Sequence, residues 1–392
     1  MDPRRNPYAP GAGTPPPELA GRDALLERVE IALDRIRSRR TDKSVIFVGL
    51  RGVGKTVLLN RILRDAEARG MHCLRLEAPE DRSLPAVLAP VLRSSLLRLD
   101  RREAASRAVT RALTALAGFV SALKVKYTDI ELSVSTPKEP GLADSGDLEV
   151  DLADLLAAVG EAARERNTSV VLFVDELQYV EENQLAALIT ALHRAAQGQL
   201  PITLVAAGLP QVVGRTGRAK SYAERLFEFP EIGPLDPTAA RLALTAPAAR
   251  EGVEFTGGAL DEILRQTQRY PYFLQEWGKH AWASADRSPI RADHVVEATA
   301  LAVADLDASF FRVRFDRLTP SEKRYLRAMA DLGPGPHRSG DVAQRLGRKV
   351  TSLGPTRSTL IAKGMIYSPS HGDTAFTVPL FDGFMERTIP QM

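Results

Sequence analysis

The sequence predicts an α/β protein with a parallel sheet, followed by an all-helical region and a small C-terminal domain. Two uninterrupted apolar runs, 45–48 and 170–174, are typical of strands buried on both faces of a parallel sheet. Stretches with helical periodicity lie on either side of each run, which is the alternation expected of an α/β fold. Strand signals are then absent from residue 237 to about residue 304, so helices should dominate there.

The α/β core should span residues 19–233. Helical periodicity is expected around residues 25–33, 58–63, 84–116, 152–162 and 185–192, with further strands at 73–76 and 202–206. Near residues 122–136, apolar and polar residues alternate with one slip of phase, which predicts an inserted β-hairpin.

Three further segments flank the core. Residues 1–18 are rich in proline and glycine and predict an ordered arm or a loose tail, because proline removes a backbone donor and fixes φ. Residues 234–304 predict a small all-helical domain. Residues 305–392 predict a domain whose first clear helix begins at Thr319, which has proline in its first turn and Glu322 at the capping-box position.

Composition excludes several classes of protein. The 392 residues include one cysteine, Cys73, so neither a disulfide framework nor a cysteine-based zinc site is expected. The six histidines lack paired metal-ligand spacing. No apolar run is long enough to span a membrane, and no signal segment follows Met1, so we expect a cytoplasmic protein without membrane contact. A net charge of +3 does not by itself imply nucleic-acid binding.

A phosphate-binding motif follows the first strand. Residues 49–56 match G-x-x-x-x-G-K-[ST] and lie between a buried strand and a helix, as this motif requires. The glycines allow backbone amides to converge on a β-phosphate, Lys55 adds a positive charge, and the Thr56 hydroxyl would bind Mg²⁺. A glycine turn beside a surface lysine is the structural alternative. The expected nucleotide ligands are Gly49, Gly52, Val53, Gly54, Lys55, Thr56 and Val57.

An acidic pair, Asp175 and Glu176, ends the second buried strand. Beside a phosphate loop, Asp175 would bind Mg²⁺ and Glu176 would polarise the attacking water, although such a pair can also be a helix cap. The strand at 202–206 is expected to lie between the two nucleotide-binding strands, as in P-loop ATPases that use a catalytic glutamate.

Together these motifs resemble the AAA+-related prokaryotic ATPases of the archaeal ATPase and STAND clades, whose domain order is like that of origin-recognition initiators. The matching segments are 19–22, 49–56, 174–178 and 266–275. The resemblance implies a P-loop core of the ASCE/AAA+ type, ATP or ADP with Mg²⁺ as ligands, and a helical lid. It also implies that Gly21 and Arg22, with Tyr8 and Pro10, line the adenine pocket; an ordinary helix start is the alternative for Arg22.

The sequence departs from this family at two positions. The strand at 202–206 ends in Ala207-Gly208, where relatives carry a polar γ-phosphate sensor, and Arg269 in the lid does not align clearly with the initiators' phosphate-facing arginine. We therefore expect slow or partner-stimulated hydrolysis. Arg225 occupies the family position of an arginine finger, with Arg215 and Arg218 as rivals; a solvated surface role is the alternative for any of these arginines. The chain is expected to be a monomer or a nucleotide-dependent oligomer.

The C-terminal domain predicts a winged helix-turn-helix, with three short helices and then two strands. Residues 338–363 contain six basic residues and one acidic residue, which favours double-stranded DNA as a partner. The expected DNA contacts are Arg348, Lys349, Ser352, Thr356 and Arg357. A winged helix that packs against the ATPase or a protein partner is the alternative.

The sequence therefore predicts an ATP-dependent molecular switch. One version is a DNA-associated ATPase. The other is a signalling or defence scaffold that binds ATP tightly, rarely hydrolyses it and uses its C-terminal domain for protein contacts.

Overall fold

The computed structural model describes residues 1–390 except 12, 79, 101–105, 125 and 131–138. The chain divides into two compact units. The sheet unit comprises Ala24–Val48 and Leu58–Glu231, and the helical unit comprises Met1–Asp23, Gly49–Val57 and Ile232–Met392. Within the described residues, no helix has the length and apolar character needed to cross a membrane.

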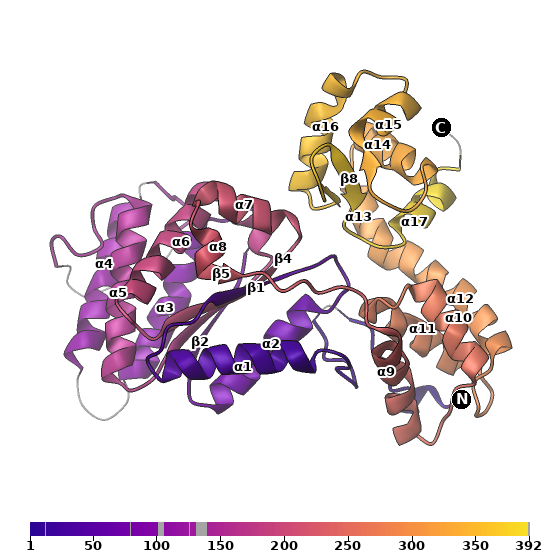
Figure 1. Ribbon diagram of the computed structural model, residues 1–392, viewed down its shortest axis with the longest axis horizontal. Helices are drawn as coiled ribbons and strands as arrows, with labels where there is room; N and C mark the ends of the chain where they lie inside the picture. The colour runs from indigo at the N-terminus through magenta and orange to yellow at the C-terminus, as the bar shows by residue number, and fades with distance from the viewer. Residues whose placement is uncertain (12, 79, 101–105, 125, 131–138, 391–392) are drawn as a thin grey trace. The chain divides into compact units, whose positions relative to one another are not determined.

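A five-stranded parallel sheet is the centre of the sheet unit (Figure 1). Its order is β2-β3-β4-β1-β5, so β4 separates β1 from β3, as the sequence predicts. The strands are β1 (Ser44–Val48), β2 (His72–Glu77), β3 (Val170–Asp175), β4 (Ile202–Gly208) and β5 (Phe227–Glu228). All of β1 and β4 is buried, which explains why both strands read as continuous runs of apolar and small residues.

Helices cover this sheet, with α1 and α2 on one side and the group around α5 and α6 on the other (Figure 1). The helices are α1 (Asp23–Arg37), α2 (Lys55–Ala68), α3 (Leu84–Asp100), α4 (Arg107–Leu123), α5 (Leu148–Glu165), α6 (Glu182–Gln197), α7 (Gln211–Ala219) and α8 (Ala223–Leu226), with the 3₁₀ turn η2 (Leu177–Tyr179) after β3. The amphipathic stretch expected at 84–116 is two helices, because Ser106 caps a new helix by accepting the Val109 N–H.

The hairpin expected near residues 122–136 is not seen where the chain is described. Leu123 ends α4, and turns follow in which the N–H of Lys126 donates to Leu123 and the N–H of Ile130 donates to Tyr127. Tyr127 and Ile130 both pack against the core of the sheet unit, so their apolar character reflects a buried turn. The remainder of the expected hairpin, residues 125 and 131–136, lies outside the described residues.

In the helical unit, residues 234–304 form helices, as predicted. These are α9 (Pro237–Arg250), α10 (Gly257–Thr267), α11 (Pro271–Ser284) and α12 (Ala292–Leu306), and a π-helical turn η3 (Asp307–Phe311) and α13 (Arg312–Asp316) continue α12. The N-terminal arm, which begins with the 3₁₀ turn η1 (Pro3–Arg5), is ordered against these helices. Trp282 Nε1 donates to the Asp2 carbonyl, and the Tyr8 hydroxyl donates to that of Leu244.

The C-terminal segment contains the three expected helices and two expected strands, with one further strand and one further helix. Its elements are α14 (Pro320–Asp331), β6 (His337–Arg338), α15 (Ser339–Arg345), α16 (Val350–Ala362), β7 (Ile366–Tyr367), β8 (Asp373–Phe376) and α17 (Phe381–Thr388). Strand β8 pairs antiparallel with both β6 and β7. The predicted capping box between Thr319 and Glu322 is confirmed.

One hydrophobic core joins this segment to the preceding helices. The ring of Phe311 lies at the junction, 6.5 Å from that of Phe273 and 5.3 Å from that of Phe384. Aromatic pairs at this separation add to the burial of their apolar surface. The segments expected as lid and C-terminal domains therefore share a core.

Candidate nucleotide-binding site

The loop between β1 and α2 has the backbone conformation that its glycines allow. Gly52 and Gly54 have φ values of 82° and 89°, in the left-handed region that favours glycine. At Gly49, an added Cβ would collide with the carbonyl oxygen of Ile232. Lys55 Nζ donates to the carbonyl oxygens of Gly49 and Leu50, each at 2.9 Å, so the lysine lies over its own loop.

Arg22 contacts this loop. Its guanidinium donates to the carbonyl oxygens of Gly233 at 2.6 Å and Val53 at 3.3 Å. Burial lowers the pKa of Arg22, and the nearby carboxylate of Asp236 opposes that effect. Glycine precedes Arg22 because Gly21 has a positive φ and packs closely against the Ala239 side chain. Arg22 therefore braces the phosphate loop.

Tyr8, which the family resemblance associates with the adenine pocket, is a buried part of the helical core. Its ring packs so closely over Gly278 that an added Cβ there would lie 2.8 Å from ring atoms. Burial strongly raises the pKa of its hydroxyl. The contacts described for Tyr8 thus attach the N-terminal arm to the helices.

Two backbone hydrogen bonds connect the phosphate loop to other parts of the helical unit. The N–H of Tyr272, in the first turn of α11, donates to the carbonyl of Gly52 at 3.1 Å. The N–H of Arg51 donates to the carbonyl of Thr377 at 2.9 Å, immediately after β8. The Thr377 side chain is itself buried and donates to the Met365 carbonyl at 3.0 Å. The loop is thus hydrogen-bonded to both the helical and the C-terminal segments.

The acidic pair lies at the carboxyl end of β3. Glu176 has a left-handed backbone with φ 53°, which is uncommon for a residue other than glycine and occurs often at functional sites. Its N–H donates to Asp175 Oδ1 at 2.8 Å. The Asp175 carboxylate therefore lies against the backbone of the residue that follows it.

Gln178 ends the segment at 174–178 that carries the family resemblance, but no role at the site was predicted for it from the sequence. It is buried, and its Oε1 accepts the N–H of Leu209 at 3.0 Å, just beyond the end of β4. That bond fixes the orientation of the amide, so Nε2 points to Glu176 and donates to its carboxylate. Gln178 thus supplies a polar group at the end of β4, where the strand itself offers only Ala207 and Gly208. In the sequence, the position of Gln178 two residues after Glu176 was the signal that could have indicated this role.

The order of the sheet fixes the direction and spacing of β1, which precedes the phosphate loop, and of β3, which ends at the acidic pair. Strands β1 and β3 are both parallel to β4 and flank it. Neighbouring strands are about 4.8 Å apart, so the carboxyl ends of β1 and β3 are separated by roughly 10 Å. Gly49 follows the end of β1 in the chain, and Asp175 ends β3. In α/β sheets, ligands generally bind beyond the carboxyl ends of the strands.

The three candidate finger arginines have different surroundings. Arg215 is half-buried and donates to the carbonyls of Gln178 and Val180, so it braces the turn after β3. Burial lowers its pKa, while Glu182 acts in the opposite direction. Arg218 is exposed and lies 3.5 Å from Glu182. Arg225 is exposed on α8 and borders a cavity of about 600 Å³.

The predicted DNA contacts divide into two groups. Arg348 and Lys349 are exposed just before α16, and Ser352 is exposed in its first turn. Arg357 is half-buried, and its guanidinium donates to Thr374 Oγ1 at 3.0 Å and to Ser368 Oγ at 2.9 Å. It therefore attaches α16 to the strands behind it. Thr356 is half-buried beside it.

Two family models match separate parts of the chain. Residues 18–205 match the family model described as AAA ATPase domain, and residues 308–385 match a domain of unknown function, DUF8462. No curated protein matches the sequence.

Several solved structures are similar to this chain at low sequence identity. A Walker-type ATPase of Pyrococcus abyssi is 14% identical, with a TM-score of 0.54, over 95% of this chain and 97% of that chain. The Orc1 protein of Aeropyrum pernix, solved in complex with DNA, is 16% identical with a TM-score of 0.47, over 94% and 93%. The Holliday junction branch migration motor RuvB of Thermotoga maritima is 15% identical with a TM-score of 0.45, over 91% and 92%.

The first of these structures has a fold like that of the whole chain, and the family match covers the phosphate loop and the acidic strand. With the sheet order observed here, these findings identify residues 18–205 as an AAA ATPase domain, so the chain contains a P-loop ATPase core of the AAA+-related type.

Proposed function

We propose that this ATPase is a slowly hydrolysing, nucleotide-dependent switch whose C-terminal segment is a DNA-binding winged helix. The observation that carries the proposal is the phosphate loop, where Gly52 and Gly54 adopt left-handed conformations and Lys55 lies over the loop carbonyls. Gly49, Gly52, Val53, Gly54, Lys55, Thr56 and Val57 would hold the phosphates of ATP or ADP. In this proposal, Lys55 exchanges the carbonyls of Gly49 and Leu50 for phosphate oxygens.

Two oxygen donors suit Mg²⁺. Thr56 lies in the first turn of α2 and Asp175 ends β3; hydroxyl and carboxylate oxygens are the ligands that Mg²⁺ prefers. When bound, Mg²⁺ neutralises charge on the β- and γ-phosphates. The Glu176 carboxylate accepts a proton from the attacking water, and Gln178 holds that carboxylate in place. Hydrolysis is slow because the sensor position at the end of β4 has no polar side chain of its own.

The switch has a direct connection to the C-terminal segment. Arg51 precedes Gly52 in the phosphate loop, and its N–H is bound to the Thr377 carbonyl. A change in the loop between ATP and ADP would therefore alter a contact with the segment that follows β8. The bond between Tyr272 and Gly52 supports the same coupling for α11. We propose a cytoplasmic protein, because its single cysteine suits a reducing compartment.

DNA binding would centre on the start of α16. Arg348, Lys349 and Ser352 are exposed there, and Thr356 lies one turn further along. The protein-binding alternative is supported by a specific observation. Three basic side chains have partners within the segment itself: Arg345 pairs with Asp331, Lys363 pairs with Glu322, and Arg357 donates to Thr374. The apolar side chain of Val350, at the start of α16, is 48% exposed.

We expect the double substitution Arg348→Ala, Lys349→Ala to weaken binding of a DNA duplex and to reduce its salt dependence. Each lost phosphate contact should lower the slope of log K against log [salt] by about 0.9. Fluorescence anisotropy at several salt concentrations measures both quantities. The matched control is Arg241→Ala, Arg265→Ala, which removes two charges from the helices before the C-terminal segment. Equal duplex binding by all three proteins would support the protein-contact alternative.

We expect Gln178→Glu to shift the acid limb of the kcat–pH profile to higher pH. The new carboxylate can still accept the Leu209 N–H, but it replaces a donor to Glu176 with a like charge, which raises the pKa of the pair. Gln184→Glu is a matched control, because Gln184 likewise accepts a backbone N–H, from Leu84, and donates to a carboxylate, that of Glu181. If both variants shift the limb equally, or neither does, Gln178 does not position the base.

Arg225 is proposed as a finger that acts on a neighbouring subunit in a nucleotide-dependent oligomer. An arginine finger contributes about 10³–10⁵ to the rate of hydrolysis. Arg225→Ala should therefore abolish any rise of specific ATPase activity with protein concentration, while leaving ATP affinity unchanged. Arg218→Ala is the control. A wild-type rate for Arg225→Ala at every protein concentration would remove this assignment.

A further inference from the structure

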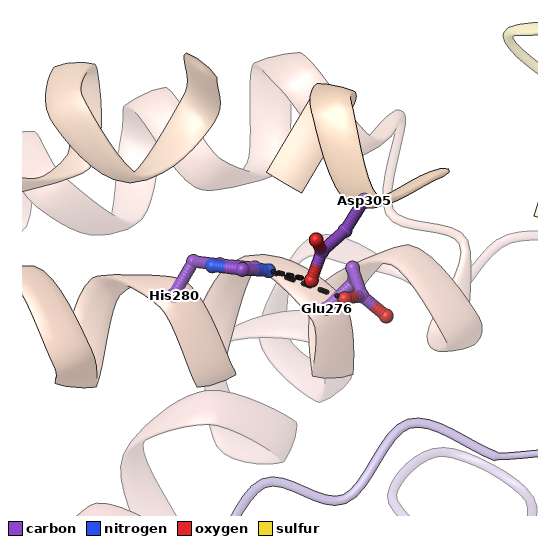
Figure 2. A group of neighbouring side chains, drawn as sticks. All are labelled: Glu276, His280 and Asp305. Atoms are coloured by element: carbon purple, nitrogen blue, oxygen red, sulfur yellow. Dashed lines mark hydrogen bonds and ion pairs between the residues drawn. The ribbon is translucent and has the colours of Figure 1, made fainter. Parts of the chain in front are cut away.

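Three metal-ligating side chains meet in the helical unit, apart from the nucleotide-binding residues. Glu276 and His280 lie on α11, and Asp305 lies near the end of α12 (Figure 2). His280 Nε2 is 3.0 Å from Asp305 Oδ2 and 3.3 Å from Glu276 Oε1. All three ligand atoms lie within 4.8 Å of one another. The cluster mixes one imidazole with two carboxylates, so a search for paired histidines does not find it.

The fold explains why the three side chains meet. Glu276 and His280 are four residues apart on a helix and therefore share one face. Helix α12 packs against α11 and brings Asp305 to that face. Glu276 and His280 are only 5% and 9% exposed, whereas the side chain of Asp305 is 55% exposed. Two ligands are thus held by packing, and the third lies on the side open to solvent.

We propose that Glu276, His280 and Asp305 form a binding site for a divalent transition-metal ion of the Zn²⁺ type. Zinc binds imidazole nitrogen and carboxylate oxygen at about 2.0–2.2 Å, so two ligand atoms at a tetrahedral centre are about 3.3–3.6 Å apart. The separation of His280 Nε2 from Glu276 Oε1 agrees with that spacing, and its separation from Oδ2 of the exposed Asp305 side chain is slightly shorter. The imidazole favours zinc over Mg²⁺ or Ca²⁺, which prefer oxygen ligands only. A water on the open side would complete the coordination.

Lys279 competes for the same oxygens. Its Nζ lies 3.4 Å from Glu276 Oε1 and 3.2 Å from Asp305 Oδ2. A metal ion must displace this ammonium group, so Lys279 acts as an internal counter-ion that weakens the site. A bound ion would tie α11 to the end of α12, just before the π-helical turn η3. Helix α11 also carries Tyr272, which binds the phosphate loop. The metal site does not depend on the proposed function.

The test is zinc titration of the chelator-treated full chain by calorimetry, with Co²⁺ absorption as a spectroscopic reporter of coordination. We expect one zinc ion per chain and a cobalt spectrum typical of nitrogen and oxygen ligands. His280→Ala should weaken zinc binding by more than about tenfold, since even residues that only support a metal ligand cost that much. Lys279→Met should tighten it. His371→Ala, which removes an exposed histidine elsewhere, should leave it unchanged.

Equal zinc affinity in the wild type and in His280→Ala would overturn the proposal, as would the absence of zinc binding in both the wild type and Lys279→Met. Circular dichroism checks the folding of each variant. Should His280→Ala not fold, Glu276→Gln replaces it as the ligand variant, because it keeps the shape of the side chain. The site is then supported if Glu276→Gln binds zinc more weakly than Lys279→Met and the wild type, and contradicted if all three bind equally.

Discussion

ATP binding is expected to weaken by roughly ten- to a hundredfold when Lys55 is replaced by Ala, because a hydrogen bond to a charged group contributes about 1.5–3 kcal/mol. The lysine Nζ already lies at the phosphate loop, 2.9 Å from the carbonyls of Gly49 and Leu50. It also stabilises charge that develops in the transition state, so hydrolysis by bound enzyme should fall a further 10²–10³-fold or so. Equilibrium binding of a fluorescent ATP analogue and single-turnover hydrolysis measure the two effects separately.

Lys43→Ala is the matched control for this variant. Lys43 precedes β1 at its opposite end, and its Nζ donates to the Glu224 carbonyl. The control should bind and hydrolyse ATP as the wild type does. Wild-type ATP affinity in Lys55→Ala would contradict the assignment of the loop as the phosphate site.

Replacing Glu176 by Gln should reduce the rate of hydrolysis by about 10²–10⁴, the usual contribution of a general base. ATP affinity should be retained, since the amide keeps the size of the carboxylate and the phosphate loop is unchanged. Gln178 Nε2 would then face an amide, which can accept the same hydrogen bond through its oxygen. The variant should therefore trap ATP, and nucleotide analysis after rapid desalting detects it.

Glu182→Gln is the control for the base, because Glu182 is an exposed acid close by in the sequence and pairs only loosely with Arg218. It should hydrolyse ATP at the wild-type rate. A Glu176→Gln variant that turned over ATP as fast as this control would show that another group activates the water.

The sequence predicts most of the sheet unit, because its signals are local. The runs before Gly49 and Asp175 are buried along their length, and the strand at 202–206 does lie between them. The capping box at Thr319 is likewise set by residues three apart. The glycines of the phosphate motif adopt the backbone conformation that the motif requires at Gly52 and Gly54.

Features that depend on contacts between distant segments could not be predicted. The bonds of Gln178 to Leu209 and of Arg51 to Thr377 join residues that only the folded chain brings together. The basic charge of Arg357 is visible in the sequence, but its partners on β8 and after β7 are not. A local signal was available for α17, where Phe381, Phe384 and Met385 have helical spacing and are all buried.

The most direct test of the central claim is a crystal structure of the wild-type chain with Mg²⁺ and a non-hydrolysable ATP analogue. We expect the β- and γ-phosphates to accept hydrogen bonds from the amides of the loop at 49–56 and from Lys55. The metal should be bound by Thr56 and held by Asp175, with Glu176 facing the γ-phosphate. An analogue bound elsewhere, or a metal without Asp175 near it, would contradict the account.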